Sequence, residues 1–257
     1  MKKYEYILCI LSFITLLFII EYNKYQELNV FNNNFLLTET IKEELEVETE
    51  METQNNKEIY KEEITSLKKE YQNDDVVATL EILNTDYKVP VVQGVDNDYY
   101  LNHLPNKEYS IMGSIFLDYR VNIDTSKKLL MFGHNSSTYN MPFDILENYY
   151  DKSYLDNHKY IEIKTTKSIK RYEIFSVFIE TKDFSYMKVD FTSTNYLDHI
   201  NNLKNKSMYD LNIDLQEDSN ILILQTCSTH KDYLKFKKKY LIIALKELEV
   251  INNDNND

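Results

Sequence analysis

The stretch ILILQTCSTH (Ile221–His230) combines the pattern of an apolar β-strand with the thiol of Cys227. A run of apolar residues followed by polar ones is typical of a buried strand that ends near the surface. The chain has two cysteines, and the other, Cys9, lies in an apolar N-terminal run. The stretch therefore poses a question, because the strand either presents Cys227 for chemistry or buries it as a small hydrophobic residue.

Other short, largely apolar segments predict a β-rich domain around this strand. They are enriched in Val, Ile, Tyr and Phe, which favour strands. The pattern indicates a mainly β fold, a closed or nearly closed β-barrel of about eight strands with peripheral helices. The predicted strands are Val76–Ile82, Lys88–Gln93, Gly113–Phe116, Leu129–Gly133, Tyr160–Thr165, Lys170–Ile179, Ile221–Thr226 and Tyr240–Glu247. Helices are expected at Pro142–Tyr149, with the proline in its first turn, and at Thr194–Asn205.

Residues 1–22 predict a signal-anchor transmembrane helix. Two lysines precede an apolar run over residues 6–20, and the flanking tyrosines suit a membrane interface. A cleaved signal peptide is the alternative, but no A-x-A-like site follows the run. The basic flank favours the N-terminus inside, so we expect a single-pass protein of the cell membrane whose folded domain is extracellular.

Composition divides the remaining chain into a stalk, a domain and a tail. Residues 23–75 are rich in Glu, Asn and Lys, which indicates an acidic stalk that ends in an N-terminal helix. A solvated acidic spacer is the alternative interpretation of residues 23–55. Residues 76–250 form the predicted β-barrel domain, and residues 251–257 a disordered tail. The net charge of −13 and the lack of a dominant basic patch argue against nucleic-acid binding.

A cysteine nucleophile needs a nearby acid–base group, and His134 is the histidine best placed to supply it. The segment LLMFGHNSS reads as an apolar strand that ends in Gly-His-Asn, so the histidine can stand at a strand end, as Cys227 does. An ordinary loop histidine remains the alternative. Cys227 and His230 form a C-x-x-H pair, but zinc needs about four ligands and no second pair lies nearby. We therefore expect no metal.

Several short motifs together resemble the sortases, and the class B branch in particular. GSIFLDYR (residues 113–120), MFGHN (131–135) and LQTC (224–227) occur in the order and spacing of that family, and PVVQGVDNDYYLNH (90–103) fits the class B branch. The resemblance implies a sortase-like closed β-barrel. It also implies a membrane-anchored cysteine transpeptidase with an extracellular catalytic domain, on the surface of Gram-positive cells.

The resemblance assigns roles to three side chains. Cys227 would be the nucleophile, and His134 the general acid and then the general base. The family places an arginine at the start of the last strand, whereas this chain has lysines there. Matching the apolar strand puts the substitute at Lys239, and spacing from the cysteine allows Lys237. Lysine provides a point charge in place of the planar fork of arginine, and a solvated basic turn is the alternative interpretation.

Five further residues are candidates for contact with a peptide substrate. Asn97 and Leu101 match positions that line the groove in the class B branch, Thr226 and Ser228 flank the nucleophile, and Tyr186 lies in the insertion before the seventh strand. Two alternatives remain open, since Leu101 could belong to the core and Asn97 could cap a short helix.

The resemblance implies that the enzyme cleaves a C-terminal sorting signal of exported proteins through a thioacyl-enzyme. It would then join the new carboxyl end to an amine of cell wall peptidoglycan or its precursor, without a cofactor. The alternatives are a catalytically silent sortase-like domain that binds wall or protein ligands, a pilin-polymerising sortase, and a structural surface protein with an unrelated β-barrel. The missing arginine motivates the silent domain.

Overall fold

A computed structural model describes residues 61–191 and 193–252 of the chain. The signal-anchor prediction for residues 1–22, most of the predicted stalk and residues 253–257 lie outside the described residues. The described part of the N-terminal extension is helical over residues 61–71.

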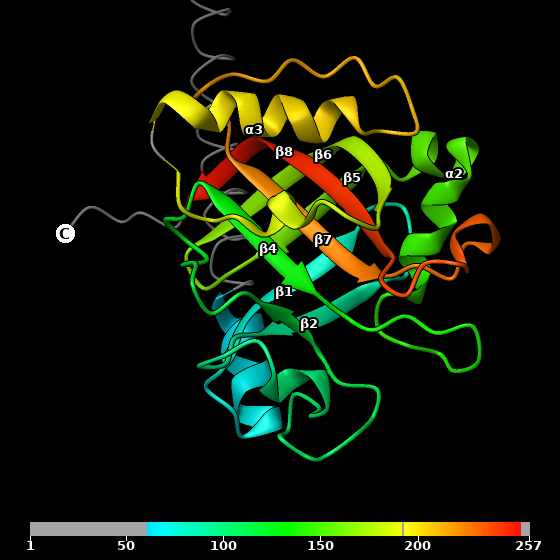
Figure 1. Ribbon diagram of the computed structural model, residues 1–257. Coiled ribbons are helices and arrows are strands. Elements are labelled where there is room, and N and C mark those ends of the chain that lie inside the picture. Colours follow the sequence, from blue (N-terminus) through cyan, green and yellow to red (C-terminus); the bar gives the residue numbers. More distant parts are fainter. Residues whose placement is uncertain (1–60, 192, 253–257) are drawn as a thin grey trace, which may run out of the picture. The chain divides into compact units, whose positions relative to one another are not determined.

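Eight strands form a closed barrel in the order β1-β2-β3-β4-β7-β8-β6-β5 (Figure 1). Most neighbours are antiparallel, but β2 pairs with β3 and β4 pairs with β7 in parallel. The strands are β1 (Val76–Ile82), β2 (Lys88–Val92), β3 (Ile115–Leu117), β4 (Lys128–Phe132), β5 (Tyr160–Lys164), β6 (Ser168–Glu180), β7 (Ile221–Cys227) and β8 (Tyr240–Asn252). The structure therefore confirms the predicted β-barrel and the position of every predicted strand to within a few residues at each end.

Alternation along the strands divides the core into an inner and an outer layer. In β4, for example, Leu129 and Met131 belong to a buried cluster with members from all eight strands, which fills the barrel. Leu130 and Phe132 point the other way and join a second buried cluster on the outside of the barrel. Because successive side chains of a strand face opposite sides, a strand with both faces covered reads as a continuous apolar run.

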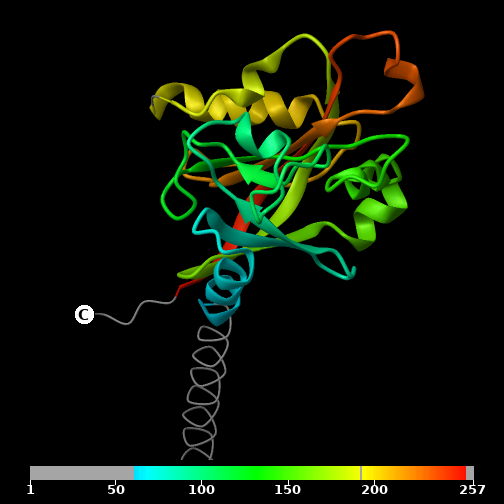
Figure 2. The same cartoon turned by 90° about the horizontal axis from the view of Figure 1, so that it is seen from below.

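Helical segments cover the barrel where the strands connect. They are η1 (Tyr99–Leu101), η2 (Asp144–Tyr150), α2 (Lys152–Asn157), η3 (Phe184–Met187), α3 (Ser193–Asn205) and η4 (Lys231–Tyr233). Helix α3 packs on the outer face, where Tyr196, Ile200 and Leu203 join the outer cluster. Figures 1 and 2 show α3 along one face of the sheet and α2 apart from it.

The helix predictions were only partly correct. The helix expected at Thr194–Asn205 is confirmed as α3. The segment Pro142–Tyr149 forms the 3₁₀ helix η2, which begins two residues after Pro142 at Asp144. Asp144 accepts hydrogen bonds from the amides of Ser136 and Met141, so its carboxylate closes the preceding loop and displaces the start of the helix.

The single-pass membrane location expected from the sequence requires correction. Across residues 61–191 and 193–252, none of the helices combines the length and apolar character that crossing a bilayer requires. The expected cell-membrane location with an extracellular domain is therefore withdrawn.

Candidate active site

The parallel pairing of β4 with β7 brings His134 and Cys227 to the same end of the barrel. The ladder runs from Lys128 opposite Ile221 to Phe132 opposite Gln225. His134 and Cys227 each lie two residues beyond that last pair, so both belong to the face that carries Phe132 and Gln225. Figure 1 shows the arrows of β4 and β7 side by side and pointing the same way.

Two side-chain hydrogen bonds hold these strand ends together beyond the ladder. The Thr226 hydroxyl donates to the Gly133 carbonyl at 2.8 Å, and the Asn135 amide donates to the Cys227 carbonyl at 2.8 Å. The residues next to the proposed base and nucleophile therefore bond across the strands. Bonds of this kind fix the backbone on both sides of the site, which positions the two side chains before a substrate arrives.

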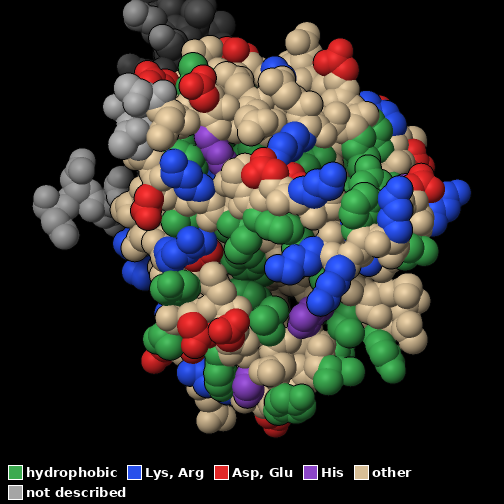
Figure 3. All heavy atoms as spheres, in the orientation of Figure 1, with side chains coloured by type: hydrophobic (Ala, Val, Ile, Leu, Met, Phe, Trp, Pro, Cys, Tyr) green, Lys and Arg blue, Asp and Glu red, His purple; other side chains and the backbone are tan. Residues whose placement is uncertain are grey.

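A groove of about 460 Å³ lies on the outer face at this end of the barrel. It is lined by Asn97, Asp98, Leu101, Phe116, Phe132, Gly133, His134, Met187, Gln225, Thr226, Cys227 and Tyr240. In Figure 3, apolar side chains gather over the centre of this face, and charged side chains, many of them basic, surround them. An apolar floor with a few polar groups around it is the usual character of a site for a small ligand or a peptide segment.

The imidazole of His134 is fixed by the backbone of the opposite wall. Its Nε2 lies 2.7 Å from the Leu101 carbonyl oxygen. Because a carbonyl can only accept a hydrogen bond, Nε2 carries the hydrogen, which leaves Nδ1 as the nitrogen that can take up a proton. Leu101 is in turn held by Gly113, whose φ of +60° allows its backbone to approach closely: a Cβ there would lie 2.5 Å from the Leu101 oxygen.

The thiol of Cys227 is free and exposed. This answers the question raised by the strand pattern, because the strand presents the thiol instead of burying it in the core. Partial burial raises the pKa of Cys227, and the positive charge of Lys239 opposes that shift. A thiol with a raised pKa is largely protonated at neutral pH, so it needs a base before it can attack.

Lys239 and Lys237 lie just before β8, which begins opposite the thiol, because Tyr240 is the ladder partner of Cys227. The charge of Lys239 is the one that lowers the pKa of the thiol. Its ammonium also donates to the Phe236 carbonyl at 3.4 Å. Lys237 is exposed. Neither lysine lines the groove.

Three of the predicted substrate contacts, Leu101, Asn97 and Thr226, line the groove. Leu101 lines it and is 36% exposed, so it is not a core residue. Asn97 also lines it and accepts a hydrogen bond from the Tyr119 amide at 3.1 Å. Asn97 does not cap the short helix η1, whose N-cap residue is Asp98. The carboxylate of Asp96 accepts from the amides of Asp98 and Tyr99 just before that helix.

Thr226 lines the groove with little exposure, whereas Ser228 and Tyr186 are not among its lining residues. Thr226 is only 1% exposed, and its hydroxyl already donates a hydrogen bond to the Gly133 carbonyl. Ser228 is 3% exposed and hydrogen-bonded to the Tyr150 hydroxyl at 2.8 Å. Tyr186 is fully buried, and its hydroxyl donates to Gln225 at 2.7 Å. Tyr186 therefore acts on the groove only through Gln225.

Sequence reasoning missed most of the apolar groove lining, namely Phe116, Phe132, Met187 and Tyr240. Phe132 and Tyr240 lie on β4 and β8, which flank the strand of the thiol, and Phe116 lies on β3, the next strand beyond β4. The alternation of strand side chains could have found them once strand order was known. It also missed Asn135, although Asn135 directly follows the proposed base.

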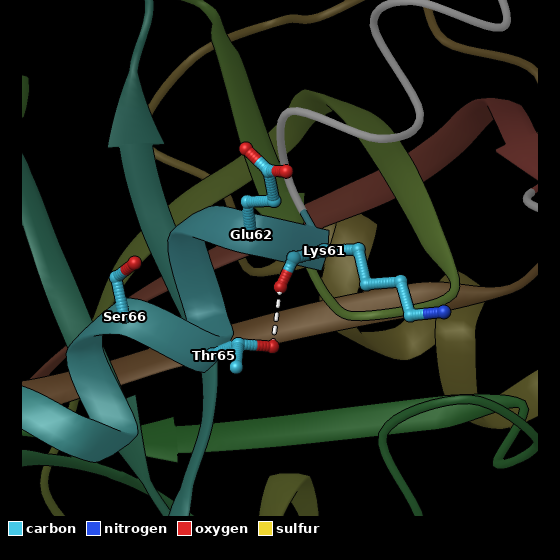
Figure 4. A pocket seen from close by; sticks show the side chains of 4 residues that line it. All are labelled: Lys61, Glu62, Thr65 and Ser66. Atoms are coloured by element: carbon cyan, nitrogen blue, oxygen red, sulfur yellow. Dashed lines mark hydrogen bonds between the residues drawn. The ribbon is translucent and has the colours of Figure 1, made fainter.

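A second hollow lies on the N-terminal helix and is lined by Lys61, Glu62, Thr65 and Ser66 (Figure 4). These side chains come from one exposed helical segment, and the Thr65 hydroxyl donates to the Lys61 carbonyl of the preceding turn. The hollow contains no thiol or imidazole among its lining residues. Among the described residues, no three side chains of His, Cys, Asp or Glu are grouped so as to hold a metal ion.

Comparison with known proteins agrees with this fold. Residues 80–247 match the family model described as the Sortase domain. Sortase B of Listeria monocytogenes is 36% identical over 165 residues, which cover 63% of this chain and 67% of that protein. The X-ray structure of Clostridium perfringens sortase B has a TM-score of 0.64 at 31% identity and covers 72% of this chain and 99% of that chain. The Staphylococcus aureus sortase B–substrate complex has a TM-score of 0.64 at 28% identity, with 72% and 84% covered.

A closed barrel with a free thiol and an imidazole in one outer groove defines the class of cysteine transpeptidases to which these relatives belong. The chain belongs to the sortase family, and its relatives place it in class B. It is therefore a sortase-type transpeptidase, as the sequence motifs predicted.

Proposed function

We propose that this sortase cleaves a peptide bond in the C-terminal sorting signal of an exported protein and transfers the acyl part to an amine of cell wall peptidoglycan or its precursor. The observation that carries the proposal is the pair of Cys227 and His134 in one peptide-sized groove. The thiol supplies the nucleophile, and the imidazole supplies the acid–base group that the reaction needs in both halves.

In the first half, the Cys227 sulfur attacks the scissile carbonyl carbon, and the thiol proton passes to His134. The carbon–nitrogen bond then breaks, the leaving amine takes the proton from His134, and a thioester remains on Cys227. Because burial raises the pKa of Cys227, the resting thiol keeps its proton, and a base within the groove is needed to remove it.

In the second half, the acceptor amine attacks the thioester carbon while His134 takes the proton of the amine. The carbon–sulfur bond breaks, the new amide leaves, and the thiolate of Cys227 recovers the proton. Each half passes through a tetrahedral oxyanion, which a nearby positive charge stabilises. Lys239 is the preferred source of that charge, because its electrostatic effect already reaches the sulfur.

The proposal is tested by incubating the full chain with a panel of fluorogenic sorting-signal peptides, with and without a peptidoglycan stem-peptide amine. We expect cleavage, an adduct on Cys227 detected by mass spectrometry when the acceptor is omitted, and an amide product when it is present. The matched control is Cys227→Ala, which cannot form the thioester. Cleavage by Cys227→Ala at the wild-type rate, or the lack of any adduct during wild-type turnover, would contradict the mechanism.

A further inference from the structure

Lys128 begins strand β4 on the same outer face as Phe132, and it is buried to 2% exposure. Its ammonium donates to the carbonyls of Tyr186 and Lys188, the latter at 2.8 Å, and lies 2.9 Å from His199 Nε2 of α3. A buried cation is costly unless its donors are satisfied. All three hydrogens of the Lys128 ammonium thus have acceptors, and two of these acceptors are backbone carbonyls of the segment that follows β6.

Arg120 binds the carbonyl of Met187, which lies between the two residues that Lys128 binds. Its Nη2 donates to the Met187 carbonyl at 3.0 Å. Its guanidinium is fixed by a bidentate pair with Asp118, at 2.9 and 2.6 Å, and the Asp118 carboxylate is fully buried. Bidentate pairing leaves the guanidinium little freedom. Three successive carbonyls, of residues 186, 187 and 188, are therefore bound by Lys128 of β4 and by Arg120, which lies in the turn after β3.

The bound segment forms part of the groove in two ways. The Met187 side chain lines the groove directly. The Tyr186 hydroxyl donates to the Gln225 side chain at 2.7 Å, and Gln225 lines the groove two residues before Cys227. The position of residues 186–188 thus determines the position of one wall and of one polar group next to the thiol.

We propose that Lys128 and Arg120 are positioning residues for the peptide substrate, because they fix the carbonyls of residues 186–188 and so set the wall of the groove beside Cys227. The inference rests on the proposed function, in which a peptide occupies this groove. Both residues act through Tyr186 and Met187, so their loss weakens substrate binding while the thiol and imidazole keep their geometry.

The binding of Lys128 does not depend on its charge. Burial lowers the pKa of Lys128 to about 7, and the nearby charge of Arg120 lowers it further. A neutral amine still has two hydrogens for the two carbonyls, and its lone pair can accept from His199. Burial also lowers the pKa of His199 to about 3, so this imidazole stays neutral beside the lysine.

Lys170 provides a matched control for Lys128. It is also a buried lysine of the barrel, at 6% exposure, and it donates to two backbone carbonyls, of Ile123 at 2.9 Å and Asp124 at 3.1 Å. The segment it binds does not line the groove. Lys170→Met therefore removes the same kind of contact at a place where the peptide does not bind.

The test compares wild type, Lys128→Met, Arg120→Lys and Lys170→Met in the full chain, with amide exchange of residues 184–191 measured on the same samples. We expect Lys128→Met to speed exchange and raise KM about tenfold while kcat changes less than about twofold. Arg120→Lys keeps a charge beside Asp118 but loses the fork, so its KM should rise by a smaller factor. Lys170→Met should leave KM and this exchange unchanged.

Three results would overturn the inference: unchanged exchange in Lys128→Met, faster exchange without a rise in KM, or an equal rise in KM for Lys170→Met. Wild-type turnover separates this inference from the proposed function. If the wild type cleaves no peptide, the proposed function fails, whereas the exchange data still decide whether Lys128 holds the segment.

Discussion

The Nε2 of His134 donates to the backbone carbonyl of Leu101 at 2.7 Å, and Leu101 also lines the groove. The imidazole is therefore held by the wall against which a substrate would lie. Gly113 lies close to the same carbonyl, and it can do so because it has no Cβ and adopts a positive φ. The orientation of the His134 ring therefore depends on Leu101 and Gly113, which are not themselves acid–base groups.

Gly113→Ala tests that chain of contacts. A Cβ at this position would lie 2.5 Å from the Leu101 oxygen, and the φ of +60° is strained for alanine by about 1–2 kcal/mol. We expect a lower midpoint of urea unfolding and a fall in kcat of about tenfold or more, because His134 loses its fixed partner.

Gly94→Ala is the matched control, since its Cβ would meet other atoms only at 3.4 Å, an ordinary contact. Its kcat should stay within about twofold of wild type. A Gly113→Ala protein with wild-type kcat would show that the Leu101 carbonyl does not determine the action of His134.

The thiol of Cys227 should titrate above the usual range for cysteine. Burial raises its pKa and Lys239 opposes that shift, so the rate of iodoacetamide alkylation should be half-maximal at a higher pH than for a free cysteine in the same buffer. Lys239→Met removes a positive charge that favours the thiolate, so the midpoint should move to higher pH. Lys237→Met should leave it in place, and an equal shift in both variants would contradict the assignment of Lys239.

Substitutions at Lys239 should change catalysis through the oxyanion. Lys239→Met should lower kcat/KM by about 10²-fold, the usual effect of losing one oxyanion-stabilising group. Lys239→Arg restores the planar fork that the sortase motif leads one to expect, and it should retain or exceed the wild-type kcat. Steady-state cleavage of a sorting-signal peptide measures both effects, and full activity of Lys239→Met would remove this residue from the mechanism.

Lys128 should make stability depend on pH. Its pKa is lowered to about 7 in the folded protein from an ordinary value of 10.5, so the unfolded chain binds more protons between these values. The free energy of unfolding should therefore rise with pH from about 7 to 10.5. Asp118, Arg120, Lys188 and His199 face this ammonium.

The comparison between wild type and Lys128→Met isolates this contribution from other groups that titrate at alkaline pH. Urea unfolding at half-unit steps of pH should show the rise in wild type and a smaller one in the variant. Parallel curves for the two proteins would show that Lys128 does not titrate in this range.

The strands and the exposed position of the Cys227 thiol could be predicted from the sequence because each is a local signal. Apolar runs such as Ile221–Thr226 give the strand, and Gly-His-Asn after another strand marks His134. The order of the strands cannot be predicted from local sequence, because it joins distant segments. The parallel pairing of β4 with β7 is what brings Cys227 and His134 to the same end of the barrel. Only the family resemblance pointed to that pairing before the structure.

The groove wall was harder to predict, because its contacts join distant segments. Nothing in the local sequence around Tyr186 indicates that its hydroxyl reaches Gln225, or that Lys128 and Arg120 bind the carbonyls beside it. Charged residues such as Lys128 are usually exposed, so its position in an apolar strand could be read only as a strand boundary. The hydrogen bond between Ser228 and Tyr150 could not be predicted either, because it also joins distant segments.

Asn135 binds the carbonyl of Cys227, and Thr226 binds that of Gly133. These cross-strand bonds join the two ends of a long excursion of the chain, which includes α3 and the segment around Met187. The reactive pair is thereby secured independently of what the excursion contains. Because β5 and β6 of the barrel also lie in this interval, only its groove-lining part around Met187 is free to vary. A change there would alter which peptide is recognised while β4 and β7 keep the pair in place.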